Sequence, residues 1–330
     1  MKFSLVVPVY NRADEVRALL ESLAQQDDRG FECIIVDDGS TLPCKSVCDD
    51  FAGKADIRYY YKENEGRSIA RNYGMDRAGG DFFVFVDSDC VLPPDYFSSL
   101  RKALEENPSD CFGGPDAAHE SFTPLQKAIN FAMTSFLTTG GIRGGKIKLE
   151  KFVPRTFNMG FSRKVYDKVG GFREMFSEDI DMSTRIRQAG FAPVLYRSVR
   201  VFHRRRVSLA KFWRQVHIFG MSRITLRLLY PGSMKLVHWL PALFVIFSIG
   251  LIVASLFFVI ALVPLLVYIL LVFVTASVSM RSVKLGAMAV VTSMIQLFGY
   301  GTGFIRAYVW KILLRHGRDE AQEVALRKGK

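Results

Sequence analysis

The feature that most constrains this chain is a long stretch without charge, because no Lys, Arg, Asp or Glu occurs from Leu236 to Met280. A further apolar stretch, 285–305, follows after two basic residues. About 20 apolar residues are enough to cross a bilayer, and the first stretch is far longer than that. A buried helix of a soluble protein is the alternative, which two adjacent uncharged spans disfavour. We expect a membrane region over 236–330 with a short basic tail and three hydrophobic segments, at 236–258, 259–280 and 285–305.

Charge is divided unevenly along the chain, whose formal net charge is +12. No Asp or Glu lies between Met182 and Arg318, whereas Lys and Arg are frequent from Arg185 to Lys235. A basic excess just before a membrane segment is typical of the cytoplasmic side and of contact with anionic headgroups. Nucleic-acid binding is the competing interpretation, which is disfavoured because the basic block adjoins the apolar stretch. The sequence therefore predicts a multi-pass protein of the cell (inner) membrane, with membrane lipids and no nucleic acid among its partners.

The N-terminal residues and the cysteines indicate that the first half of the chain faces the cytoplasm. The segment "MKFSLVVPVYNR" has a short apolar run that includes Pro8 and lacks a small-residue cleavage site, so we do not interpret it as a signal peptide. The five cysteines are odd in number and lack the spacing of a zinc or CxxC motif. We expect them to be free thiols in a reducing compartment.

Short apolar runs alternate with helical patterns over the first half of the chain. Strands are predicted at 3–10, 31–40, 57–63 and 81–89, and helices at 12–26 and 66–78. Further along, we expect a strand ending at Asn158, a helix from Arg163, a break at Gly170-Gly171 and a helix opening near Glu178. This alternation predicts an α/β fold with a mostly parallel sheet, flanked by helices, and a crevice at the carboxyl ends of the strands.

Residues 206–235 are expected to form basic amphipathic helices between this domain and the membrane region. Ser208–Leu229 combines Lys and Arg with aromatic residues such as Trp213, which suits helices that lie in the membrane interface. A break between two helices is expected at Gly220. An ordinary surface helix of the soluble domain is the alternative.

Paired carboxylates follow two of the predicted strands. Asp37 and Asp38 end one strand, and Asp87 and Asp89 end another, so all four are expected to converge at one edge of the sheet. Asp87 and Asp89 point to the same side of an extended chain and can share a hard cation, Mg²⁺ or Mn²⁺. Phosphate oxygens usually complete such a shell, and a metal that bridges a diphosphate stabilises it as a leaving group. Alone, the pair is equally compatible with a solvated, capped turn.

Six motifs occur in order: "VPVYNR", "IIVDDGS", "NEGRSIARNYG", "FVDSD", "NMGFSRKVYDKVGGF" and "SEDIDMSTRIRQAG". Their order and spacing resemble the family 2 inverting glycosyltransferases, which have a GT-A fold. The resemblance covers about residues 3–205. It implies a cytoplasmic GT-A domain over 1–205 that binds a nucleotide sugar and a divalent metal.

The resemblance also implies roles for individual residues. Those around the nucleotide would be Pro8 and Tyr10 along its site, Asp37 and Asp38 at the uracil base, and Gly66 and Arg71 near the ribose and diphosphate. Asp87 would contact the donor ribose or sugar, and Asp89 would bind the metal directly. In some related enzymes a His at the position of His203 completes the metal shell. A structural or phosphate-facing His is the alternative.

The pair Glu178-Asp179 resembles the family's catalytic acids, of which the second, Asp179, is the general base. A positioned carboxylate can take the proton of the acceptor hydroxyl as it attacks the anomeric carbon opposite the diphosphate. This single displacement inverts the configuration. An acidic first helical turn, favourable to the helix dipole, is the alternative.

The sequence therefore predicts a membrane-anchored hexosyltransferase that uses a UDP-sugar. The membrane region suggests a lipid-linked (polyprenyl) saccharide as acceptor, in the synthesis of a surface polysaccharide or glycan. A polyprenyl-phosphate glycosyltransferase and a non-catalytic membrane scaffold that binds nucleotide sugar are the alternatives. A processive synthase is disfavoured because no Q-x-x-R-W motif is present.

Overall fold

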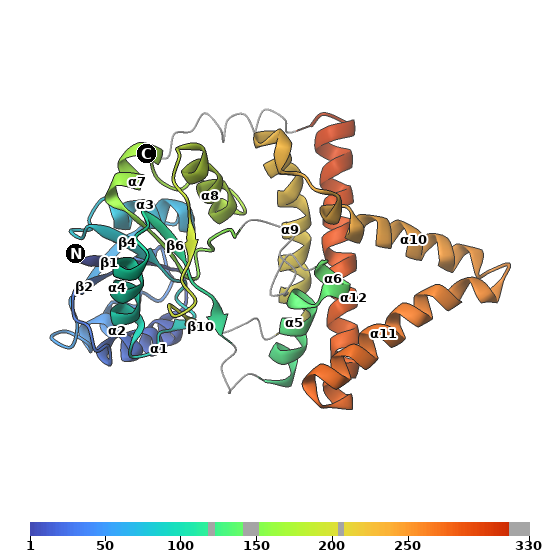
Figure 1. Ribbon diagram of the computed structural model, residues 1–330, viewed down its shortest axis with the longest axis horizontal. Helices are drawn as coiled ribbons and strands as arrows, with labels where there is room; N and C mark the ends of the chain where they lie inside the picture. The colour runs from blue at the N-terminus through green and yellow to red at the C-terminus, as the bar shows by residue number, and fades with distance from the viewer. Residues whose placement is uncertain (118–122, 141–151, 204–207, 317–330) are drawn as a thin grey trace. The chain divides into compact units, whose positions relative to one another are not determined.

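The computed structural model describes residues 1–117, 123–140, 152–203 and 208–316 (Figure 1). These residues form two compact units. The sheet unit contains 1–117 and 152–203, and the helical unit contains 123–140 and 208–316. The segment 123–140 therefore interrupts the sheet unit in sequence but packs with the C-terminal helices.

A seven-stranded sheet forms the centre of the sheet unit, in the order β3-β2-β1-β4-β8-β6-β9. Four neighbouring strands are parallel: β1 (Phe3–Val9), β2 (Phe31–Asp38), β3 (Ile57–Lys62) and β4 (Phe82–Phe85). The other half is mixed, because β8 (Met159–Ser162) is antiparallel to β4 and to β6 (Cys111–Gly113), and β9 (Val194–Leu195) is parallel to β6. A smaller sheet has the order β5-β10-β7, made of Cys90–Val91, Val201–His203 and Asp116–Ala117.

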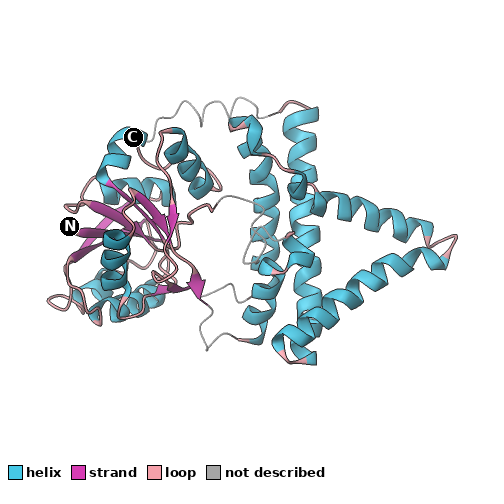
Figure 2. Cartoon of the chain, in the orientation of Figure 1, coloured by secondary structure: helices cyan, strands magenta, loops and turns pink. Residues whose placement is uncertain are grey.

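Helices flank the seven-stranded sheet (Figure 2). They are α1 (Ala13–Ala24), α2 (Lys45–Asp49), α3 (Arg67–Met75), α4 (Tyr96–Glu106), α7 (Arg163–Val169) and α8 (Glu178–Gln188). Leu5 of β1 belongs to a buried cluster with residues of α1 and α4, whereas Val6 belongs to a second cluster with residues of α3 and α8. Strands covered on both faces are near-continuous apolar runs, as β1 and β2 are. The predicted α/β fold with a mostly parallel sheet is confirmed.

The order of the parallel strands reverses at β1, which has β2 on one side and β4 on the other. At such a point the connections leave in opposite directions and open a crevice beyond the carboxyl ends of the strands. Tyr10 directly follows β1, and Asp87 lies just beyond β4. The fold therefore presents the predicted site residues where a parallel sheet offers a binding crevice.

Two expected strand boundaries in the sheet unit are wrong. The strand expected at 81–89 ends at Phe85, so Asp87 and Asp89 lie beyond β4, where the chain turns. The strand expected to end at Asn158 instead begins after it, as β8. The buried Asn158 side chain accepts a hydrogen bond from the Tyr96 hydroxyl at 2.7 Å and donates one to the Val199 carbonyl at 2.8 Å. It therefore ties together three segments and holds the loop that leads into β8. The expected break at Gly170 is confirmed, since α7 ends at Val169 and Gly170 has a φ of 80°.

The described part of the helical unit consists of α5 (Pro124–Thr134), α6 (Phe136–Thr139), α9 (Leu209–Leu229), α10 (Leu240–Ala254), α11 (Val263–Met280) and α12 (Val283–Tyr308). Two helical segments, Val259–Met280 and Val283–Leu313, are long and apolar enough to cross a membrane. The first of the three expected segments, 236–258, forms a 3₁₀ turn at Leu236–His238 and then the 15 residues of α10. The α-helix is therefore shorter than the roughly 20 residues of a spanning helix.

The expected break at Gly220 is wrong, because α9 continues through it. Gly220 serves helix packing instead: a Cβ atom there would lie 2.1 Å from the Tyr300 carbonyl oxygen of α12. Gly303 of α12 is placed in the same way, with a Cβ position 2.1 Å from the His217 carbonyl oxygen of α9. The two backbones approach so closely that only glycine fits, as is common between membrane-type helices.

Candidate active site

The candidate site lies within the sheet unit, where the carboxyl ends of β1, β2 and β4 meet the first turns of α3 and α8. Carboxylates come from two strand ends and from the start of α8, and arginines come from α3. This arrangement results from the topology, since parallel strands end at one edge and α3 returns from β3 across the sheet.

Arg71 is the link between two of the predicted acids. Its side chain is 1% exposed, and its guanidinium donates one hydrogen bond to Glu178 Oε1 and another to Asp87 Oδ1, both at 2.9 Å. Arg67, one turn earlier on α3, donates to the other Glu178 oxygen at 2.6 Å. A buried carboxylate such as Glu178 is stable only when it is paired in this way. The structure therefore brings together Arg71, Asp87 and Glu178 from three distant segments.

A clamp beside Arg71 fixes the position of α3. The Asn72 side chain accepts a hydrogen bond from the Phe172 backbone N–H at 2.7 Å and donates one to the Phe172 carbonyl at 2.8 Å. The ring of Phe172 also lies below the Arg71 guanidinium, 5.5 Å from its centroid. The Arg71 side chain is therefore held in one orientation by its two carboxylate partners and by the ring of Phe172.

Asp87 and Asp89 differ in their surroundings. The Asp87 side chain is 36% exposed and pairs with Arg71, whereas the Asp89 side chain is 14% exposed and lies 4.0 Å from Nη1 of Arg12. Arg12 in turn donates to Glu15 at 2.5 Å. Both carboxylates follow the end of β4, between the cations of α3 and of the segment after β1.

These two carboxylates fit a hard divalent cation by their chemistry, because Mg²⁺ and Mn²⁺ prefer oxygen ligands. Within the described ranges, no group of three or more His, Cys, Asp or Glu side chains is arranged to hold a metal. A metal at Asp87 and Asp89 would thus take its remaining ligands from the substrate or from water, as is usual for Mg²⁺. The backbone of His203 pairs with Cys90, next to Asp89. Its side chain lies outside the described part of the structure, so its metal role stays a prediction.

Asp179 begins α8 together with Glu178. Its carboxylate accepts hydrogen bonds from Arg155 Nη1 at 3.2 Å and from the Ile180 backbone N–H at 2.8 Å. Burial by itself raises the pKa of Asp179, but the charge and hydrogen bond of Arg155 and the Ile180 N–H outweigh it, so the pKa lies below its ordinary value. Asp179 is therefore held as a carboxylate, the form that a general base requires.

Asp37 and Asp38 are buried and organise the loops after β2. Asp37 accepts hydrogen bonds from the Ser40 and Cys44 backbone N–H groups and from the Tyr59 hydroxyl, each at 3.0 Å. Asp38 accepts from Lys62 Nζ at 2.9 Å and from the Gly66 backbone N–H at 2.9 Å. Recognition of a base by either residue stays a prediction.

Gly66 and Tyr10 lie at the ends of the segments that frame the site. Gly66 precedes α3 with a φ of 100°, and a Cβ atom there would lie 2.6 Å from Glu174 Oε1, so glycine is required. Tyr10 is 51% exposed at the end of β1, after the half-buried Pro8. An exposed ring at this edge is able to stack on a ligand.

Sequence reasoning missed three residues of this site: Arg67, Arg155 and Asn11. Arg67 lies four residues before Arg71, a spacing that places both on one face of a helix, so the motif contained the signal. Arg155 carries no local signal, because its contact with Asp179 depends on the fold. Asn11 has a φ of 54°, and its side-chain oxygen accepts from the Thr41 backbone N–H at 2.8 Å, which joins the loops after β1 and β2.

The cysteines all belong to the sheet unit. All five are free and buried, as expected. Burial raises the pKa of the Cys33 and Cys90 thiols and raises that of Cys111 to about 12. These groups are protonated at neutral pH and are not candidate nucleophiles.

The sequence of this chain is similar to those of known proteins over its first half. The model of the family described as Glycosyl transferase family 2 matches residues 4–170. An uncharacterized glycosyltransferase of Rickettsia felis is 38% identical over 106 residues, and glycosyltransferase GlyA of Streptococcus pneumoniae is 37% identical over 111 residues. The matches cover 32% and 33% of this chain but only 18% and 16% of those relatives.

Two solved structures have similar folds over most of this chain. The mannosyltransferase PcManGT from Pyrobaculum calidifontis, in complex with GDP-Man and Mn²⁺, has a TM-score of 0.55 and 17% identity, covering 95% of this chain and 87% of its own. S. aureus TarS 1–349, in complex with UDP-GlcNAc, has a TM-score of 0.50 and 19% identity, covering 96% and 93%. At these identities the likeness concerns the fold, and it supports the predicted GT-A fold.

Proposed function

Because the family model matches half of the chain, the chain belongs to glycosyl transferase family 2, and we propose that it is a membrane-anchored, inverting hexosyltransferase. It moves a sugar from a nucleotide diphosphate sugar, expected to be a UDP-sugar, to a lipid-linked saccharide. The observation that carries the proposal is the buried Arg71, which joins Asp87 of the strand end to Glu178 beside the proposed base. A donor at Asp87 and an acceptor at Asp179 would then meet at one edge of the sheet.

The proposed chemistry is a proton transfer to Asp179. Its lowered pKa keeps it ionised, so it is ready to take the proton of an acceptor hydroxyl. The hydroxyl oxygen forms the new bond to the anomeric carbon while the bond from that carbon to the diphosphate oxygen breaks on the opposite face. Arg155 holds the Asp179 carboxylate in position, and Glu178 orients Arg71 and Arg67.

Asp87 and Asp89, and by resemblance His203, are the proposed metal-binding residues. A divalent cation there would neutralise charge on the diphosphate leaving group. On the nucleotide side, we assign the ribose and diphosphate to the region of Gly66 and Arg71, and the base to the region of Tyr10 and Asp38. The similar PcManGT structure holds GDP-Man and Mn²⁺ and the similar TarS structure holds UDP-GlcNAc, which together support a nucleotide-sugar donor. The choice of uridine rests on the resemblance of the motifs.

The acceptor proposal rests on the helical unit. Its two long apolar segments, and the lack of acidic residues in its described ranges 123–140 and 208–316, suit an attachment to anionic membranes, on the cytoplasmic side. A membrane-attached catalyst has ready access to a polyprenyl-linked acceptor. Reaction with bare polyprenyl phosphate, without any saccharide, would instead identify a polyprenyl-phosphate glycosyltransferase.

The first test is calorimetric titration of the detergent-solubilised protein with UDP, GDP and CDP, with and without Mn²⁺. We expect UDP to bind in a Mn²⁺-dependent manner, and Asp89→Asn to abolish that dependence. Asp167→Asn is the matched control, because Asp167 is an exposed residue of α7. Preference for GDP or CDP would contradict the role of Asp38 in recognising uracil, but the proposed glycosyltransferase activity would stand. Absence of binding by the intact protein would favour a non-catalytic relative.

A further inference from the structure

Among the described residues, the turn between α10 and α11 exposes five consecutive large apolar side chains. Leu256, Phe257, Phe258, Val259 and Ile260 are each between 71% and 79% exposed. A turn that emerged into water on the far side of a membrane would leave all five side chains hydrated, which is unfavourable. The Ser255 hydroxyl, the polar side chain of this turn, is satisfied locally by the Ile252 carbonyl at 2.6 Å. The turn therefore suits a hydrocarbon environment.

Basic residues lie at the ends of α10 and α11 that point away from this turn. Lys235 precedes α10, and Arg281 and Lys284 follow α11, with no charged residue between Lys235 and Arg281. In Figure 1, α10 and α11 diverge from the turn, and their other ends lie near α12. The basic ends are thus the base of a hairpin, and such residues suit anionic headgroups.

The helix α12 runs across the base of this hairpin. A Cβ atom at Gly301 would lie 2.4 Å from the Pro241 carbonyl oxygen at the start of α10, and one at Gly286 would lie 1.9 Å from Ser277 Oγ at the end of α11. The two glycines are separated by about 22 Å along α12, at 1.5 Å per residue. Helices of a spanning bundle pack nearly parallel instead. The helices α10 and α11 therefore contact α12 at two separate points.

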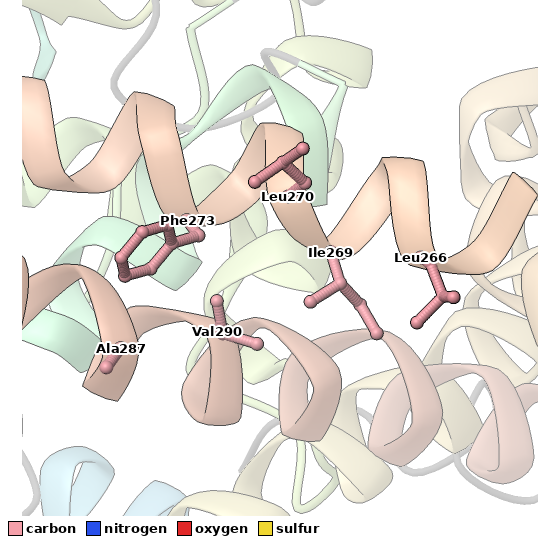
Figure 3. Close-up of a pocket in the computed structure, with 6 residues that line it drawn as sticks. All are labelled: Leu266, Ile269, Leu270, Phe273, Ala287 and Val290. Carbon is pink, nitrogen blue, oxygen red and sulfur yellow. The ribbon is translucent and has the colours of Figure 1, made fainter. Parts of the chain in front are cut away.

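An open apolar cavity of about 380 Å³ marks the divergence of α11 from α12 (Figure 3). Its lining extends from Leu266 to Phe273 on α11 but only from Ala287 to Val290 on α12. The unequal spans indicate that α11 leaves α12 at a steep angle. The cavity lies between the two helices, where acyl chains would fill it.

Because α9 packs against α12, the crossing of a membrane by α12 would be energetically unfavourable. The helix α9 packs along α12, with Val216 beside Gly299, and reaches the π-helical turn Val309–Leu313 that follows α12, where Lys311 Nζ lies 3.2 Å from the Thr225 hydroxyl. It carries basic residues along its length, at Lys211, Arg214, Arg223 and Arg227. If α12 crossed the bilayer, these charges would enter the hydrocarbon with it.

From these observations we infer that α10 and α11 form a re-entrant hairpin, while α12 and α9 lie along the membrane surface. The hairpin enters and leaves on one and the same side of the membrane, and its turn ends within the hydrocarbon. The shorter helix of the hairpin limits this depth: the 15 residues of α10 are about 22 Å long, whereas the hydrocarbon core is about 30 Å thick. The other segment of the hairpin, Val259–Met280, has the length to cross, so the connection to α10 is what keeps it on one side. The inference rests on the proposed membrane attachment and replaces the three spans expected from the sequence.

The test is cysteine labelling of the full-length chain in sealed vesicles of both orientations, with a membrane-impermeant maleimide. The variants are Phe258→Cys in the turn, Gly232→Cys and Val283→Cys at the base, and Leu314→Cys beyond α12. The parent chain is the background control, because its five cysteines are buried. We expect the base variants and Leu314→Cys all to be labelled from one and the same side of the membrane and not from the other. The Phe258→Cys variant should be labelled from neither side until detergent is added.

Two other outcomes would overturn the inference in different ways. Labelling of Phe258→Cys or Leu314→Cys from the opposite side would show a spanning segment and leave membrane attachment intact. Release of the parent chain by a carbonate wash, with Phe258→Cys labelled without detergent, would reject the attachment itself. Neither outcome affects nucleotide binding, which the calorimetric titration measures separately.

Discussion

At the scale of single residues, Arg71 decides whether the acids of the candidate site come together. It is the largest fully buried side chain of the described residues, and its charge is compensated by Glu178 and Asp87. Removing one member of a buried ion pair leaves an uncompensated charge in a medium of low dielectric, which costs about 3–5 kcal/mol. Arg71→Met would leave Glu178 with Arg67 as its remaining cation, so we expect it to destabilise the sheet unit by up to about that amount.

The cysteines provide the measurement for this variant. All five are buried in the sheet unit, so thiol reactivity during a urea titration reports the unfolding of that unit. The control is Arg17→Met, since Arg17 pairs with Asp50 at 2.8 Å but both side chains are exposed. Surface pairs of this kind contribute about 0–1 kcal/mol. Equal midpoints for the two variants would contradict the structural role of Arg71.

A second residue-scale prediction concerns Arg155 and the pH dependence of activity. Arg155 provides the largest effect that opposes burial, so removing its charge in Arg155→Gln should raise the pKa of Asp179. The base would then lose its ionised form at a higher pH. We expect the acid limb of the profile of kcat/KM against pH to move to higher pH, while activities converge above it. Kinetic measurement over the acid range checks this shift.

Two further variants make this prediction specific. Arg155→Lys keeps a cation and should move the acid limb less, and the exposed Arg197→Gln should leave it in place. A uniform loss of activity without movement of the limb would mean that Asp179 is not the titrating base. It would then assign Arg155 a purely structural contribution.

At the scale of secondary-structure elements, glycines determine how α9 and α12 pack. Gly303→Ala would place a Cβ atom 2.1 Å from the His217 carbonyl oxygen, so the two backbones must separate. Overpacking of this kind costs about 1–3 kcal/mol, and backbone atoms yield less readily than side chains. We expect a lower urea midpoint in detergent, followed by tryptophan fluorescence, because all three tryptophans lie in the helical unit.

Gly250→Ala is the matched control for this element. Gly250 lies in α10, and a Cβ atom there would meet nothing within 4 Å. Alanine in an exposed helix position favours the helix by about 1 kcal/mol over glycine. The control should therefore be neutral or stabilising. If both variants lowered the midpoint equally, the close approach of α9 and α12 would be refuted.

At the scale of the whole molecule, the two units differ in the solvent that their surfaces suit. Leu256 of the hairpin turn and Leu42 of the sheet unit are both 79% exposed. Arginine in the middle of a bilayer costs about 2.5–3.5 kcal/mol, whereas arginine in water costs nothing comparable. We expect Leu256→Arg to lower the fraction of protein that remains in the membrane after a carbonate wash.

Leu42→Arg should leave that fraction unchanged, because Leu42 belongs to the unit that we assign to the aqueous phase. The measurement is the amount of protein in the pellet and in the supernatant of the same vesicle preparation. A loss of membrane attachment with Leu42→Arg would indicate that the sheet unit also contacts lipid. Full retention of Leu256→Arg would place the turn in water.

The sequence by itself determined which elements form and where charge and apolar residues lie. Periodicity and apolar runs identified β1, β2, β3, β4 and the helices α1 and α3, but not the short α2, because local patterning reflects the two faces that each element must bury. Paired acids after strands, with the order of the motifs, placed the predicted site at one edge of the sheet. The same composition identified the apolar segments, since no packing is needed to recognise an uncharged stretch.

Only the tertiary structure decided which residues meet across long distances. The pairing of Arg71 with Glu178 and of Arg155 with Asp179 depends on how α3 and the segment before β8 approach α8, which no local signal contains. The role of Gly220 was also decided there: in sequence a glycine indicates a break, but in the fold it is the absence of a side chain that lets α9 touch α12. Contacts of this kind depend on distance in space, and distance in the sequence does not determine them.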